Sequence, residues 1–149
     1  MNETHKQDTF LSLAEVLENA SDRCLNAERN LRGCLYKVDE PHSLALGEMA
    51  ANERDLAELL SAFAKNAPEH VLETRFQYTL DTVAHPEPED PFEAARYLVD
   101  TNERIVDELR EQARNAIPER VVEALDVLWR EVEAKGRRIS MIHVTMQDA

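Results

Sequence analysis

Apolar residues recur at alternating spacings of three and four along four long stretches of this chain, and this pattern restricts the fold more than any other feature. A period of 3.6 residues is typical of α-helices that bury one face. We therefore predict an all-α fold with four long helices. Their buried faces are formed by Phe10, Leu13, Leu17, Ala20, Cys24, Ala27, Leu31, Cys34 and Val38; by Leu46, Met49, Glu53, Leu56, Leu60 and Phe63; by Phe92, Ala95, Val99, Asn102, Val106, Leu109, Ala113 and Ala116; and by Val121, Leu125, Leu128, Val132, Lys135, Ile139 and Ile142.

Length and composition agree with this assignment. A chain of 149 residues fits one domain, so we expect a single helical domain over residues 1–149. Only 3 Gly and 6 Pro occur, too few for the many turns of a β-sandwich or barrel. The 43% of hydrophobic residues is enough to build a core.

The lengths of the connections predict how the helices are joined. Few residues separate the first two helices around Pro41 and the last two around Pro118, so each pair should form an antiparallel hairpin. Residues 67–91 form a much longer middle link, with a short amphipathic helix expected over residues 68–83. This link is long enough to cross the bundle, which would give the ferritin-like connectivity of two hairpins and one crossover. Alternatively, it caps one end of the bundle.

The net charge restricts which partners the chain can bind, and the cysteine positions restrict which disulfides it can form. The formal net charge of −13 would repel a phosphate backbone and an anionic membrane surface, so we expect neither nucleic-acid nor membrane binding. No apolar run is long enough to span a bilayer and no signal peptide is apparent, so we expect a cytoplasmic protein. Cys24 and Cys34 fall on one helix about 15 Å apart, too far for a disulfide, and should be buried as small apolar residues.

Four glutamates stand on the four predicted helices in a suggestive order: Glu28, Glu53, Glu103 and Glu133. This order resembles that of the metal-binding carboxylates of ferritin-like di-metal proteins. The segments 103–110 and 128–135 are similar to the second hairpin of bacterial ferritin-like proteins of unknown function, some of them stress-associated. The resemblance implies a four-helix bundle that binds two divalent metal ions through these glutamates, as an oxidoreductase or a storage protein.

The chain departs from the family pattern at two positions. Metal-binding members carry Glu-x-x-His on the second and fourth helices, whereas here Leu56 and Gly136 stand where the histidines would be. The loss of both nitrogen ligands argues against a redox di-iron site. The four glutamates are therefore weak metal candidates, and we expect no cofactor and no catalytic residue.

Glu53 is the most unusual residue, because Leu46, Met49 and Leu56 share its helix face. A buried carboxylate needs a metal, a cation or a raised pKa. We favour a structural polar layer in which Lys135 or Asn102 is its partner, since such a layer can fix helix register without any chemistry.

Three classes of function follow. The first, which we favour, is a non-enzymatic bundle that acts as a structural or protein-interaction module, as a homodimer and with a possible further protein partner. The second is the di-metal protein implied by the resemblance. The third is a bundle that binds a small apolar molecule between its helices, suggested by small residues on the buried faces such as Ala20, Ala95 and Ala113.

Overall fold

The structure, a computed structural model, describes residues 6–81, 90–115 and 119–147. Within these ranges the long helices are α1 Leu13–Cys34, α2 His42–Asn66, α4 Pro91–Asn115 and α5 Glu119–Gln147, and the short ones are η1 Leu35–Lys37 and α3 Glu69–Leu72. Helix dominates, which confirms the all-α prediction. Across the described ranges, no helix has both the length and the apolar character of a membrane span.

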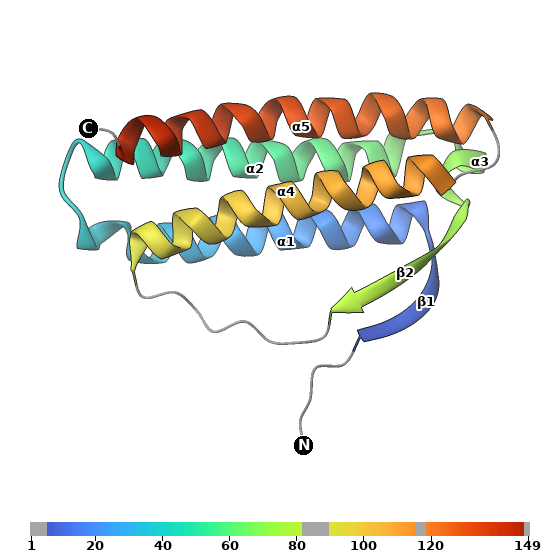
Figure 1. The fold of residues 1–149 in the computed structure, drawn as a ribbon, viewed down its shortest axis with the longest axis horizontal. Coiled ribbons are helices and arrows are strands. Elements are labelled where there is room, and N and C mark those ends of the chain that lie inside the picture. The colour runs from blue at the N-terminus through green and yellow to red at the C-terminus, as the bar shows by residue number, and fades with distance from the viewer. Residues whose placement is uncertain (1–5, 82–89, 116–118, 148–149) are drawn as a thin grey trace, which may run out of the picture.

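The four long helices lie side by side (Figure 1). Helix α1 packs mainly against α2 and α4, and α5 packs mainly against the same two helices. In Figure 1, α1 and α2 run in opposite directions, as do α4 and α5, and α1 is also opposite to α4. Helix α4 therefore begins at the end of the molecule opposite to the one where α2 finishes. The link between them starts at one end and finishes at the other.

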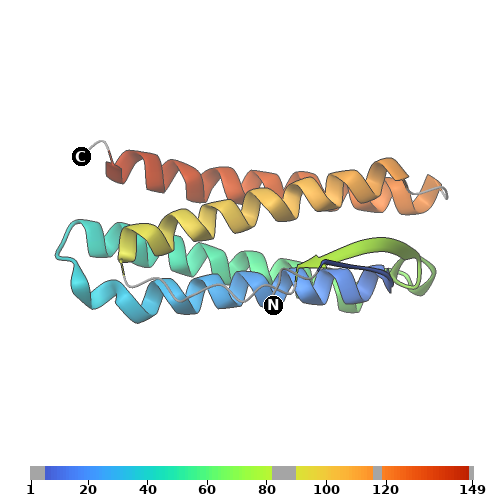
Figure 2. The same ribbon diagram turned by 60° about the horizontal axis from the view of Figure 1, so that its bottom comes forward.

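A two-stranded antiparallel sheet is the main departure from the expected fold. Strands β1 Lys6–Ser12 and β2 Arg75–Asp81 pair with Leu11 opposite Phe76. Figure 2 shows both strands beside the half of the bundle where α1 begins and α2 ends. Phe76 is 6% exposed and joins the core, which anchors the sheet to the helices.

Two predictions at this sheet are wrong. The helix expected over residues 68–83 is limited to α3, and residues 75–81 form β2. The physical reason is that Phe76, Tyr78 and Leu80 alternate with polar residues, a period of two that favours a strand once a partner is available. Phe10, assigned to the first helix, lies in β1 and is 65% exposed.

The start of α1 explains why the first helix begins later than predicted. The Ser12 hydroxyl accepts a hydrogen bond from the Glu15 backbone N–H at 3.2 Å, and the Glu15 carboxylate accepts one from the Ser12 backbone N–H at 3.0 Å. This reciprocal capping box satisfies two backbone donors that the first turn of a helix leaves free. It sets the boundary between β1 and α1.

Replacing Ser12 with alanine should lower the free energy of unfolding by about 1 kcal/mol, because the cap is lost while the helix remains. Urea denaturation followed by circular dichroism measures this change. Ser43→Ala in the first turn of α2 is the matched control, since α2 has no side-chain cap. Equal losses in both variants would contradict the role of the capping box.

The buried apolar residues of the described chain form two clusters, one in each half of the bundle. On α2, Leu56 belongs to one cluster and Met49 to the other. Between them lies Glu53, and at the corresponding place on α4 lies Asn102, both buried. The polar pair thus separates the two halves of the core.

Candidate functional site

The polar layer lies where all four long helices meet at one level. Its buried pair is Glu53 from α2 and Asn102 from α4, with Cys24 of α1 and Gly136 of α5 beside it. A Cβ atom added at Gly136 would lie 3.8 Å from Asn102 Cβ, so these two residues are direct neighbours. The glycine therefore borders the buried side chain of Asn102.

The contact at the centre of this layer is a hydrogen bond between Asn102 and Glu53. Asn102 Nδ2 donates to Glu53 Oε1 at 2.7 Å, and both residues are almost fully buried, with 3% and 0% exposure. The Cys24 thiol lies next to them, with its Sγ 3.9 Å from Asn102 Oδ1. Within the described residues, Glu53 Oε2 is buried without a hydrogen-bond partner. The carboxyl is therefore only half satisfied.

This environment changes the ionisation of Glu53. Burial raises the pKa of the carboxyl from 4.5 to about 8, although the hydrogen bond from Asn102 and the nearby Cys24 thiol partly oppose the increase. The nearby charge of Glu28 raises it further. Burial also raises the pKa of the Cys24 thiol, and the Glu53 carboxyl adds to that effect. At neutral pH both groups are mainly uncharged.

Glu28, one of the four candidate metal ligands, is buried with 5% exposure. Its Oε2 accepts a hydrogen bond from Arg32 Nε at 2.8 Å on the same helix. Its Oε1 lies 3.9 Å from Arg54 Nη1 on α2. Burial is possible because two guanidinium groups compensate the carboxylate.

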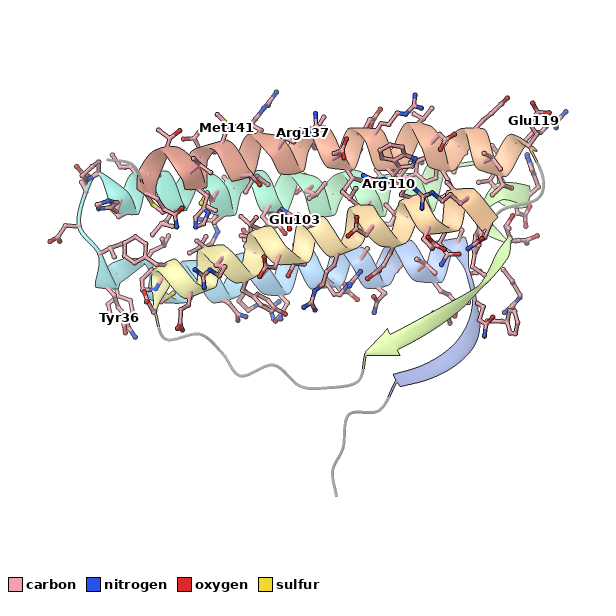
Figure 3. All side chains as sticks on the ribbon, viewed as in Figure 1. Tyr36, Glu103, Arg110, Glu119, Arg137 and Met141 are labelled. Atoms are coloured by element: carbon pink, nitrogen blue, oxygen red, sulfur yellow. The ribbon has the colours of Figure 1, made fainter. Side chains whose placement is uncertain are left out.

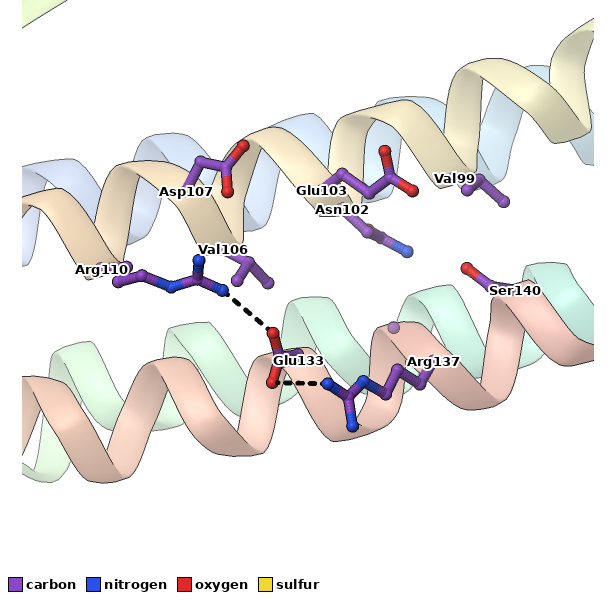
Figure 4. Close-up of a pocket in the computed structure, with 10 residues that line it drawn as sticks. Val99, Asn102, Glu103, Val106, Asp107, Arg110, Glu133, Arg137 and Ser140 are labelled. Atoms are coloured by element: carbon purple, nitrogen blue, oxygen red, sulfur yellow. Dashed lines mark hydrogen bonds and ion pairs between the residues drawn. The ribbon is translucent and has the colours of Figure 1, made fainter.

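Glu133 lies in a groove between α4 and α5 that has a volume of about 220 Å³. Its two oxygens are 3.0 Å from Arg110 Nη2 and 3.3 Å from Arg137 Nη2, and Figure 4 shows the carboxylate between the two guanidinium groups. Glu103 also lines this groove but is exposed. Asn102 lies at its inner side, so the groove leads from solvent to the polar layer.

The four candidate glutamates are thus not brought together. Glu53 is bonded to Asn102, Glu28 and Glu133 are paired with arginines, and Glu103 faces solvent. Over the described part of the chain, no three His, Cys, Asp or Glu side chains cluster in a way that could hold a metal ion. The buried layer can keep a proton on Glu53. The carboxylates of Glu28 and Glu133 are instead held by ion pairs with arginines.

Of the two partners expected for Glu53, one contacts it and the other does not. Asn102 is its hydrogen-bond donor, as proposed from the sequence. Lys135 is half-buried on α5, and among the described residues no ion pair joins it to Glu53. An amide is the less costly partner here, because burying an ammonium group as well would require a second desolvation.

Leu56 and Gly136, at the two positions of the missing histidines, have distinct environments. Leu56 is completely buried in one apolar cluster. Gly136 lines the groove between α4 and α5 beside Asn102. One position thus serves core packing and the other forms part of a groove wall.

Sequence reasoning missed the arginines that compensate Glu28 and Glu133. A usable signal was present, because Glu28 and Arg32, and Glu133 and Arg137, are four residues apart with the acid first. That spacing favours an ion pair on a helix surface. The partners from other helices, Arg54 and Arg110, have no such local signal.

Comparisons of the chain with protein-family models, with curated proteins and with solved structures found no match.

Proposed function

We propose that this protein is a non-enzymatic, ferritin-like four-helix bundle that acts as a protein-interaction module. The observation that carries the proposal is a set of large apolar side chains exposed near one end of the bundle, where η1, the start of α2 and the end of α5 lie. Contiguous exposed apolar surface marks sites of protein contact, and we infer such a surface at this end. The set comprises Tyr36 (81% exposed), Leu44 (63%), Met141 (63%) and Val144 (47%).

The helix directions support the ferritin-like part of the proposal. In Figure 1, α2 and α4 run in the same direction, so the link between them returns the chain to the opposite end. Two antiparallel pairs joined by such a crossover are typical of ferritin-like bundles. A simple up-down-up-down bundle would require α2 and α4 to run in opposite directions.

The ion pairs support the non-enzymatic part. Carboxylates that bind metals in bundles project inward from facing helices towards the shared site. Here Glu28 and Glu133 each contact two guanidinium groups. A metal ion at either glutamate would have to displace arginines that cannot be deprotonated. These contacts favour a structural role for both residues.

A di-metal protein is the second candidate, and one specific observation favours it. Glu53 Oε2 is buried and lacks a hydrogen-bond partner among the described residues. A divalent cation near this oxygen would lower the pKa of the carboxyl and satisfy it. The proton that Glu53 retains at neutral pH offers an alternative that needs no metal.

Metal analysis separates the two candidates. We expect protein purified without chelator to contain far less than one metal ion per chain, and added Fe²⁺, Mn²⁺ or Ca²⁺ to leave the Tm unchanged. A metal that binds the folded state must raise the Tm. Stoichiometric metal that is lost in Glu53→Gln, but kept in the exposed control Glu18→Gln, would overturn the proposal and support the di-metal protein.

A further inference from the structure

A second groove lies at the end of the bundle that exposes apolar side chains. It runs between the start of α2 and the end of α5 and has a volume of about 480 Å³. Its floor is mainly apolar, whereas its two sides carry opposite charges. Its lining includes His42, Ala45 and Glu48 from α2, and Arg138, Met141 and Ile142 from α5.

The apolar part of this groove, here termed the α2/α5 groove, continues onto the surface beside it. Met141 lines the groove and is 63% exposed on α5, at the upper edge of the molecule in Figure 3. Leu44 is 63% exposed on α2, one helical turn before Glu48. The His42 ring packs edge-on against Phe92 with centroids 5.7 Å apart, which fixes one side of the groove. The surface is thus apolar and preformed.

The charges at the groove indicate which partner fits it. Glu48 and Arg138 are exposed on its two sides, and within the described residues neither forms an ion pair. Residues 134–147 contain Lys135, Arg137 and Arg138 and no acidic residue, although the chain has a net charge of −13. The end of α5 is therefore a basic segment, where a second acidic chain meets less repulsion than at the acidic stretches of the helices.

We propose that the α2/α5 groove is the interface with a second copy of this chain, related by a two-fold axis; this rests on the proposed interaction function. In a two-fold interface, a residue pair formed once is formed twice with the roles exchanged. Glu48 of each copy then faces Arg138 of the other, and Met141 of each copy enters the apolar groove of the other. An unrelated partner would not require the two sides to complement each other.

The first test compares two substitutions of exposed apolar residues on the same helix. Wild-type protein should change from 17.0 kDa to twice that mass as concentration rises, measured by sedimentation equilibrium. Met141→Asp should weaken dimerisation about 30-fold or more, because it places a charge at the apolar centre. Val127→Asp is the matched control: Val127 is 58% exposed on α5, about 21 Å away along the helix. It should leave dimerisation unchanged.

The second test exchanges the charges. In Arg138→Glu, two acidic groups face each other across the interface, and in Glu48→Arg two basic groups do. Each variant alone should therefore dimerise about tenfold more weakly than wild type. Mixing the two variants should restore dimers, because every facing pair is then opposite in charge. The double variant Glu48→Arg/Arg138→Glu should also dimerise like wild type.

The outcomes separate this inference from the function on which it rests. The α2/α5 interface is overturned if the protein is a monomer at all concentrations, if Met141→Asp and Val127→Asp have equal effects, or if mixing the two charge variants does not restore dimers. If that monomer is free of metal, the interaction module survives with a different partner. If it holds stoichiometric metal, the proposed function fails as well. Circular dichroism of each variant verifies that a lost dimer is not an unfolded chain.

Discussion

Replacing Glu53 with glutamine is expected to remove a loss of stability that the wild-type protein undergoes as the pH rises from 5 to 9. Glu53 is completely buried, and burial raises its pKa from 4.5 to about 8. Between these two values the unfolded chain has released the proton while the folded chain retains it. The contribution of Glu53 to the stability of the folded state is therefore largest at low pH.

The sign of the effect follows from that difference in bound protons. Stabilisation by the protonated carboxyl is complete below about pH 4.5, decreases as the pH rises towards 8, and is constant above. Since one pKa unit corresponds to about 1.4 kcal/mol, Glu53 alone should reduce the free energy of unfolding by roughly 4 kcal/mol between pH 5 and 9. Glutamine has a similar shape and no charge to bury.

The measurement is urea denaturation of wild type and Glu53→Gln at several pH values. Other groups titrate in both proteins, so the difference between the two curves isolates Glu53. The difference should grow in favour of the variant as the pH rises. Glu103→Gln, on the exposed side of α4, is the control and should parallel wild type. A pH-independent difference for Glu53→Gln would mean that the carboxylate is charged in the folded protein throughout.

Much of the helical architecture follows from the sequence because helix periodicity is a local property. The prolines preceding α2 and α5, and the one at the start of α4, limit where those helices begin, and the 3.6 period identifies the faces that they bury. Cys24 and Cys34 are buried and free, as their places on the apolar face of α1 predict. Each of these conclusions needs only neighbouring residues.

The strands were missed because pairing is non-local. Residues 75–81 are compatible with a helix period as well as a strand period, and only the alignment of Leu11 with Phe76 decides between them. The same limit applies at the site. Glu53 and Asn102 stand out because each interrupts an apolar face, whereas the role of Arg54 and Arg110 depends on how the helices pack.

Asn102→Asp should be the most damaging single substitution in the polar layer, and its effect should depend strongly on pH. It replaces the amide that donates to Glu53 Oε1 at 2.7 Å with a second buried carboxyl. At pH 5 the two acids can share a proton, so a loss of about 1 kcal/mol is expected. At pH 8 the unfolded chain has released both protons, so the folded chain must either retain a shared proton or bury two charges at close range, and the loss should exceed about 3 kcal/mol.

The double variant Glu53→Gln/Asn102→Asp tests whether this loss arises from the pair itself. It exchanges the two groups, so that an amide on α2 can donate to a carboxylate on α4 and a single acid remains. If the hydrogen bond between the two residues governs the layer, the double variant should be more stable than Asn102→Asp alone at pH 8. A loss that glutamine at position 53 does not reduce would place the cost elsewhere, in the packing around Gly136 or in the thiol of Cys24, both of which border the Asn102 side chain.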